Sequence, residues 1–210
     1  MKLLSFFFAF KKIDSCELLD VLLRNANKKN EILRKYGVEA LMCAISCANF
    51  EGVRLLIDFG ANINQQSRYG WSTIHEAANV GNVEILQYLL DNGGNVNIKD
   101  NECKTPLHVA CDNCNLEIVK LLKANGCDLE LIDKCGWSAL HISCGHNDLE
   151  TVKYLIENGA NIDASDTNGH KPLNWAVTFK SIEVIQFLVN IRNKLQLNRK
   201  DYSNNTTENE

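Results

Sequence analysis

The feature that most constrains the fold is a repeat with a period of 33 residues. His75, His108 and His141 lie 33 residues apart along the chain. A period of this length indicates stacked structural units, in which each unit buries its apolar face only against its neighbours. Glycines and leucines recur at the same interval, at Gly60, Gly93, Gly126 and Gly159, and at Leu56, Leu89, Leu122, Leu155 and Leu188.

Each unit has the pattern of two short helices followed by a turn-rich connection. A hydroxyl residue precedes the first helix and a small polar residue precedes the second, where each side chain can accept a hydrogen bond from an unpaired backbone N–H. The recurring glycine follows the second helix, at a position that often needs a positive φ. Cys103 replaces a glycine that other units have in the connecting hairpin, so we expect either backbone strain or a shifted hairpin there. The expected caps are Ser72, Thr105 and Ser138 for the first helices, and Asn82, Asn115, Asn147 and Ser181 for the second helices.

Segments such as ECKTPLHVACDNCNLEIVKLLKANGCDLE and CGWSALHISCGHNDLETVKYLIENGANID resemble ankyrin repeats in the order of their helix starts, glycines and turns. The resemblance covers about residues 36–190. It implies an all-α solenoid of about five helix-turn-helix repeats with projecting β-hairpin loops. The predicted organisation is an N-terminal helical cap at residues 1–35, repeats at 36–65, 69–98, 102–131 and 135–164, a degenerate C-terminal repeat at 168–197, and a disordered polar tail at 198–210.

Residues 136–146, GWSALHISCGH, contain hydroxyl, imidazole and thiol groups that could serve catalysis or metal binding. The Ser138–His141 pair recurs in the two preceding units without an acidic partner, which argues against a catalytic triad. Zinc needs its ligands within ~2.3 Å of one centre, whereas equivalent residues of stacked helices are about 8–10 Å apart. We therefore predict no catalytic residue, metal site or cofactor, and a metal-binding protein that uses Cys111 and Cys114 is the less favoured alternative.

The resemblance implies a non-enzymatic protein that binds another protein through its concave groove and hairpin tips. Tryptophans at hairpin tips, Trp71 and Trp137, are costly to expose unless a partner buries them. With Val109, Ile142 and Trp175 they predict an apolar strip in the groove, unless both indoles fold back onto the next hairpin. The candidate partner-binding residues are Arg68, Tyr69, Trp71, Glu76, Asn79, Lys104, Val109, Asp112, Trp137, Ile142, His170 and Trp175.

Charge and hydropathy argue against nucleic acids and membranes as partners. The net charge is -4, and the basic residues form no stripe that could follow a phosphate backbone. No later segment approaches the ~20 apolar residues that a membrane span requires. The N-terminal run MKLLSFFFAF is expected to be a cap helix and not a secretion signal, because two lysines follow it at once and no cleavage site is present. We expect a monomer.

The chain has nine cysteines, and most of them lie in apolar helical blocks, where cysteine acts as a small hydrophobe. This usage favours a reducing compartment, the cytoplasm or the nucleus. The stretch GWSTIHEAA also resembles repeats of ubiquitin-ligase adaptors, which implies an adaptor role as an alternative, although the residues after 190 are too few and too polar for the box of that family. Asn64 and Asn97 lie where ankyrin asparagines can be hydroxylated.

Overall fold

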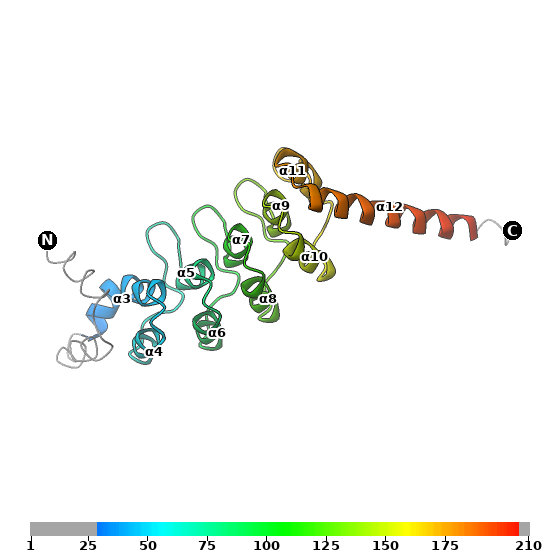
Figure 1. The fold of residues 1–210 in the computed structure, drawn as a ribbon. Coiled ribbons are helices and arrows are strands. Elements are labelled where there is room, and N and C mark those ends of the chain that lie inside the picture. Colours follow the sequence, from blue (N-terminus) through cyan, green and yellow to red (C-terminus); the bar gives the residue numbers. More distant parts are fainter. Residues whose placement is uncertain (1–28, 206–210) are drawn as a thin grey trace.

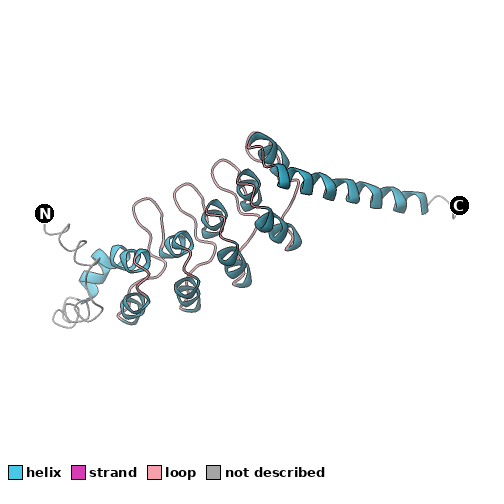
Figure 2. Ribbon diagram, in the orientation of Figure 1, coloured by secondary structure: helices cyan, strands magenta, loops and turns pink. Residues whose placement is uncertain are grey.

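The computed structural model describes residues 29–205 of the chain, so the cap predicted at residues 1–35 lies mostly outside the described part. Successive pairs of antiparallel helices stack side by side into an elongated solenoid (Figure 1). For residues 29–205, Figure 2 draws only helices and loops, which agrees with the predicted all-α solenoid. The pairs are α3 (Lys29–Ser46) with α4 (Phe50–Asp58), α5 (Thr73–Val80) with α6 (Val83–Asp91), α7 (Pro106–Asp112) with α8 (Leu116–Ala124), α9 (Ala139–Gly145) with α10 (Leu149–Glu157), and α11 (Pro172–Thr178) with α12 (Ile182–Asn205).

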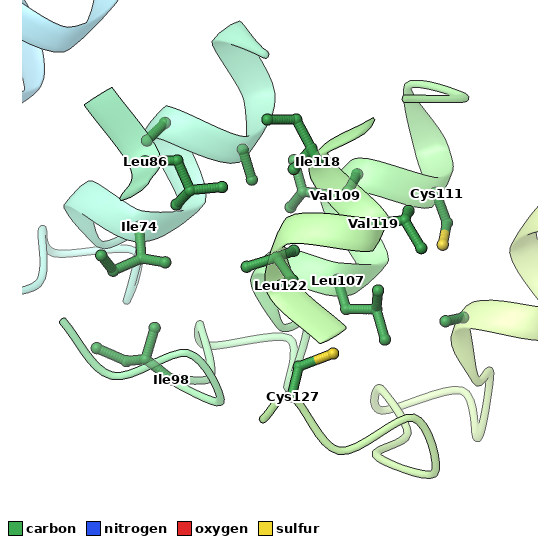
Figure 3. Packing of buried hydrophobic residues seen from close by; sticks show 14 of the residues in the cluster. Ile74, Leu86, Ile98, Leu107, Val109, Cys111, Ile118, Val119, Leu122 and Cys127 are labelled. Carbon is green, nitrogen blue, oxygen red and sulfur yellow. The ribbon is translucent and has the colours of Figure 1, made fainter. Parts of the chain in front are cut away.

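The first helices of the pairs form one layer of the solenoid and the second helices form the other. Each first helix packs directly on the first helix of the next pair, from α3 through α11. Figure 3 shows that buried side chains of the α5–α6 and α7–α8 pairs belong to one cluster, including Leu86 and Leu107. The recurring leucine of the second helix is almost fully buried in every described unit, and each such burial contributes about 1.5–3 kcal/mol. Among the described residues, no helix combines the length and apolarity needed to span a bilayer.

The predicted caps of the second helices are confirmed at two positions and wrong at two others. The Oδ1 atoms of Asn82 and Asn115 accept hydrogen bonds from backbone N–H groups at 2.9 and 3.2 Å. In the next unit the cap is Asp148 and not Asn147, because the strict 33-residue register leads from Asn115 to Asp148. Asn147 lies in the turn before it with a φ of 57°. The hydroxyl of Ser181 donates to the Gly145 carbonyl at 3.2 Å instead of capping α12.

The connecting loops form a second ladder of contacts beside the helices. The expected β-hairpins are reduced to isolated bridges, such as that between Ile132 and Ser138. Each loop also donates a backbone hydrogen bond to the loop before it, as from Thr167 N–H to the Cys135 carbonyl at 3.1 Å. This close approach explains Gly136, where a Cβ atom would lie 2.6 Å from the Thr167 nitrogen. Cys103, where strain or a shifted hairpin was expected, has a φ of 60°, in the left-handed region that favours glycine.

The last helix differs from the predicted boundaries. Residues 198–210 were expected to form a disordered tail after the final repeat, yet α12 continues to Asn205. The four earlier second helices end at glycines with positive φ, whereas the equivalent position in α12 is Arg192. An arginine gives no preference for the left-handed stop, so the helix continues past that position.

Candidate functional site

The three recurring histidines, His75, His108 and His141, are structural groups, and we call them the capping histidines. The Nδ1 atom of His108 accepts a hydrogen bond from the Thr105 N–H at 3.1 Å, and the Thr105 hydroxyl lies 2.8 Å from the same atom. Because Nδ1 is an acceptor, the ring proton is on Nε2, which donates to the Trp137 carbonyl of the next loop at 2.9 Å. Burial lowers the pKa of each capping histidine, so the rings are neutral.

Two buried cysteines of the first helices, Cys111 in α7 and Cys144 in α9, are also structural. Burial raises the pKa of Cys111 and of Cys144 to about 12, so neither thiol ionises at neutral pH. A thiol that does not ionise is a poor nucleophile and a poor metal ligand. Within the described part of the chain, no three His, Cys, Asp or Glu side chains are close enough together to hold a metal ion. The alternative of a site on Cys111 and Cys114 therefore finds no support in the geometry.

Trp71 does not protrude from its hairpin as predicted. Its indole is half-buried and stacks on the ring of His75, with ring centroids 4.9 Å apart and an interplanar angle of 27°. The indole Nε1–H donates to the Glu76 carboxylate at 3.0 Å, and the Ser46 hydroxyl donates to the other oxygen of that carboxylate. The indole has therefore folded back, onto the helix of its own repeat and not onto the next hairpin.

Trp137, Trp175 and Phe179 form a continuous aromatic run at the C-terminal end of the solenoid, which we call the groove aromatic cluster. The rings of Trp137 and Trp175 meet edge to face with centroids 4.3 Å apart, and Trp175 contacts Phe179 at 5.4 Å. The side chain of Phe179 is 58% exposed. Exposed aromatic area that is held in place by its neighbours is typical of residues that anchor a protein partner.

Buried polar contacts fix the orientation of this cluster. The Trp175 Nε1–H donates to Asp166 Oδ2 at 3.2 Å. Asp166 Oδ1 accepts the backbone N–H groups of Asn168 and His170, both at 2.8 Å. Burial opposes ionisation of Asp166, but these hydrogen bonds outweigh it and hold the pKa of the carboxyl below its usual value. The ionised carboxylate therefore anchors both the loop and the indole.

The sequence interpretation missed Phe179 as a site residue, although the glycine at position 145 was a signal for it. Gly145 stands where the two preceding first helices have Asn79 and Asp112. A Cβ atom on Gly145 would lie 3.3 Å from the Trp175 ring and 3.5 Å from the Phe179 ring. The absence of a side chain at Gly145 leaves space for the rings of Trp175 and Phe179.

The predicted exposure of Val109 and Ile142 is wrong. Each side chain is only 6% exposed, and Val109 lies among the core residues in Figure 3. The reason is the direct packing of α7 on its neighbouring first helices, α5 and α9, which encloses the position one residue after the capping histidine. The apolar strip predicted along the whole groove is therefore confined to the groove aromatic cluster.

Polar candidates lie along the same layer of first helices. The Asn113 side chain donates to Asn79 at 3.1 Å, and His146 lies 3.0 Å from Asp112, so two consecutive repeats are each linked to the previous one at this edge. Asn79 and Asp112 remain exposed and can contact a partner.

The candidate partner-binding residues at the loop tips lie at both ends of the series of connecting loops. Arg68 and Tyr69 are exposed together, with the guanidinium 4.6 Å from the ring centroid, and Tyr69 is 63% exposed. Lys104 is half-buried, while its carbonyl oxygen accepts the Nε2–H of His75 at 2.9 Å. The exposed ring of His170 lies 3.6 Å from Asp166. The structure thus places Arg68 and Tyr69 at the opposite end of the described loop series from the aromatic cluster.

The proposed modification sites have a structural role. The Asn64 side chain donates to the Gly93 carbonyl at 2.9 Å and accepts the Asn95 N–H at 2.7 Å. Asn97 Oδ1 likewise accepts the Asp128 N–H at 2.9 Å. Both asparagines therefore link consecutive repeats, and their hydroxylation remains a prediction.

Comparison with known proteins gives one family. The family model described as ankyrin repeats, in three copies, matches residues 6–100, 49–133 and 107–201. No match to a curated protein is found. Ankyrin repeats are generally protein–protein interaction modules and typically have no enzymatic activity. The matches span most of the chain and coincide with the stacked helix pairs, and the chain belongs to the ankyrin repeat family.

Proposed function

We propose that this protein binds a partner protein across the layer of first helices, with the groove aromatic cluster as the apolar anchor. The observation that carries the proposal is the exposed ring of Phe179 packed at a tilt against the Trp175 indole, which Trp137 and Asp166 hold in place. Binding that buries one such aromatic side chain gains about 1.5–3 kcal/mol from area alone. Anchors of this kind commonly dominate the binding energy of an interface.

The scaffold around the anchor supports rigid recognition. The capping histidines join each first helix to the next loop. On the side of the second helices, the Asn97 side chain joins the loop that follows α6 to the loop that follows α8. A surface whose neighbouring repeats are already joined in this way loses little conformational entropy on binding. We assign selectivity to polar groups beside the groove, namely Arg68, Glu76, Lys104 and Asp112.

The proposal assigns no catalytic residue to the chain and expects a monomer without nucleic-acid or membrane ligands. Neutral capping histidines and unionised buried thiols support a binding role over a catalytic one. The cytoplasm or nucleus is the proposed location, since Cys111 and Cys144 serve as core residues and need no oxidising environment.

Capture of partners from a lysate of the source cells tests the proposal. Phe179→Asp introduces a charge at the anchor, and Val83→Asp introduces the same charge at an apolar residue of the second-helix layer, 46% exposed. We expect Phe179→Asp to lose partners that the wild type and Val83→Asp both retain, with circular dichroism showing equal folding. Loss of the same partners from Val83→Asp alone would show that the binding surface is elsewhere.

A further inference from the structure

Three buried side-chain oxygen atoms without a hydrogen-bond partner lie in the repeat formed by α9 and α10. Within residues 29–205, the buried side-chain atoms that lack a partner are Ser143 Oγ, Asp148 Oδ2 and Thr151 Oγ1. Ser143 and Thr151 are fully buried as whole residues. A buried oxygen that lacks a partner destabilises the folded protein, so native structures satisfy such atoms with protein groups or with internal water.

Contacts around the turn between the two helices bring these side chains together. The Asp148 N–H donates to the Ser143 carbonyl at 3.2 Å, and Asp148 Oδ1 accepts the Thr151 N–H at 3.2 Å. Burial raises the pKa of the Cys111 thiol in α7, the Ser143 hydroxyl lowers it and the Asp148 carboxylate raises it further, so both side chains lie beside this thiol. The three polar side chains are therefore gathered around one turn.

The two hydroxyl residues stand at positions that are apolar in other repeats. Alanine occupies the position of Ser143, and isoleucine or valine occupies that of Thr151, namely Ala77, Ala110 and Ala176, and Ile85, Ile118 and Val184. All of these residues are fully buried. The stack therefore needs no polar atom at either position, and the occurrence of two hydroxyls in one repeat, beside a buried carboxylate oxygen, indicates a local role.

The donors and acceptors of this cluster match one water molecule. A carboxylate oxygen accepts hydrogen bonds, and each hydroxyl can both donate and accept, whereas the neighbouring Cys111 thiol is a weak partner for either. Neither hydroxyl bonds Asp148 Oδ2 directly. One water can donate to Oδ2 and to one hydroxyl while it accepts from the other, and three polar partners are the usual number for a buried water. Water fits better than a metal ion, because no three His, Cys, Asp or Glu side chains converge in the described part of the chain.

We propose that the turn between α9 and α10 holds an internal water molecule that bridges Ser143 Oγ, Asp148 Oδ2 and Thr151 Oγ1. This water joins the last turn of α9 to the first turn of α10. It stabilises the repeat whose loop carries Trp137, one ring of the groove aromatic cluster. The site contacts no partner, so it goes beyond the proposed function and does not depend on it.

The sign of a stability change tests the proposal in the full chain. Thr151→Val removes one hydroxyl and keeps the shape of the side chain, and Ser143→Ala removes the other hydroxyl. Each variant should lower the midpoint of urea unfolding by about 0.5 M. The double variant should lose less than the sum, because both hydroxyls bind one water. The matched control Val184→Thr places a hydroxyl at the same position of the last repeat, beside Ala176 in place of a serine, and should also lower the midpoint.

Two results would overturn the proposal. A urea midpoint that rises or stays the same in Thr151→Val would show that the hydroxyl has no partner to lose, since removal of an unsatisfied buried group does not destabilise a protein. A crystal structure gives the direct observation, and its electron density should show a water about 2.5–3.0 Å from all three oxygens. Density in which Thr151 bonds Asp148 directly, with no water between them, would be the second contrary result.

Discussion

Replacement of His108 separates two stabilising roles that one imidazole performs. Its Nδ1 atom caps the start of α7 and its Nε2–H bonds the next loop at the Trp137 carbonyl. The last repeat contains a natural version with only the first role, because Asn174 Oδ1 accepts the Lys171 N–H at 2.8 Å. His108→Asn should therefore keep the cap and lose the bond between repeats, whereas His108→Ala should lose both.

The magnitudes follow from these contacts. Loss of a helix cap costs about 1 kcal/mol. Loss of the bond between repeats removes one of the two hydrogen bonds at the Trp137 carbonyl, which still accepts the Asp133 N–H at 3.0 Å, and a single hydrogen bond contributes about 0.5–1.5 kcal/mol. We expect the free energy of unfolding to fall by about 2 kcal/mol in His108→Ala and by about 1 kcal/mol in His108→Asn.

Urea unfolding at pH 7.5, followed by tryptophan fluorescence and by circular dichroism, measures both variants. The two probes should give one transition for the stack, with the midpoint shifted and the slope unchanged. If the two variants lose equal stability, the Nδ1 cap contributes nothing. A loss below about 0.5 kcal/mol in both would refute the assignment of the bond between repeats as a stabilising contact.

Three further predictions concern pH, the loop glycines and the end of α12. Burial lowers the pKa of the capping histidines in the folded state. Their contribution to stability is therefore complete above about pH 6.5 and is lost as pH falls through the folded pKa. The urea midpoint should decline less steeply from pH 7.5 to 5 in His108→Asn than in the wild type. Gly136→Ala should lower the free energy of unfolding by more than about 2 kcal/mol. Gly169→Ala should lower it by only about 1 kcal/mol, because Gly169 has nearly the same φ but open space around its Cα atom. Equal thermal shifts in the two variants would contradict the close approach of the loops at Gly136. Arg192→Gly should end α12 near that residue and reduce the helical signal at 222 nm, and an unchanged signal would show that the missing glycine does not explain the longer helix.

The parts of the fold that follow from local chemistry could be predicted from the sequence. Ser72 and Asn115 were assigned as caps because a cap depends on two or three neighbouring residues, and both lie at helix starts in the structure. The 33-residue period then placed the same elements in each unit. The one error of register, Asn147 for Asp148, arose where two polar residues stand together and only the strict period distinguishes them.

The candidate site was harder to predict because it depends on contacts between repeats. Whether Val109 is exposed depends on how closely α7 and its neighbours approach, which no local pattern specifies. The directions of the Trp71 and Trp175 indoles depend on the carboxylates of Glu76 and Asp166, which lie five and nine residues away along the chain. Comparison of equivalent positions among repeats could have found the missing space at Gly145, since it is the one glycine in its column.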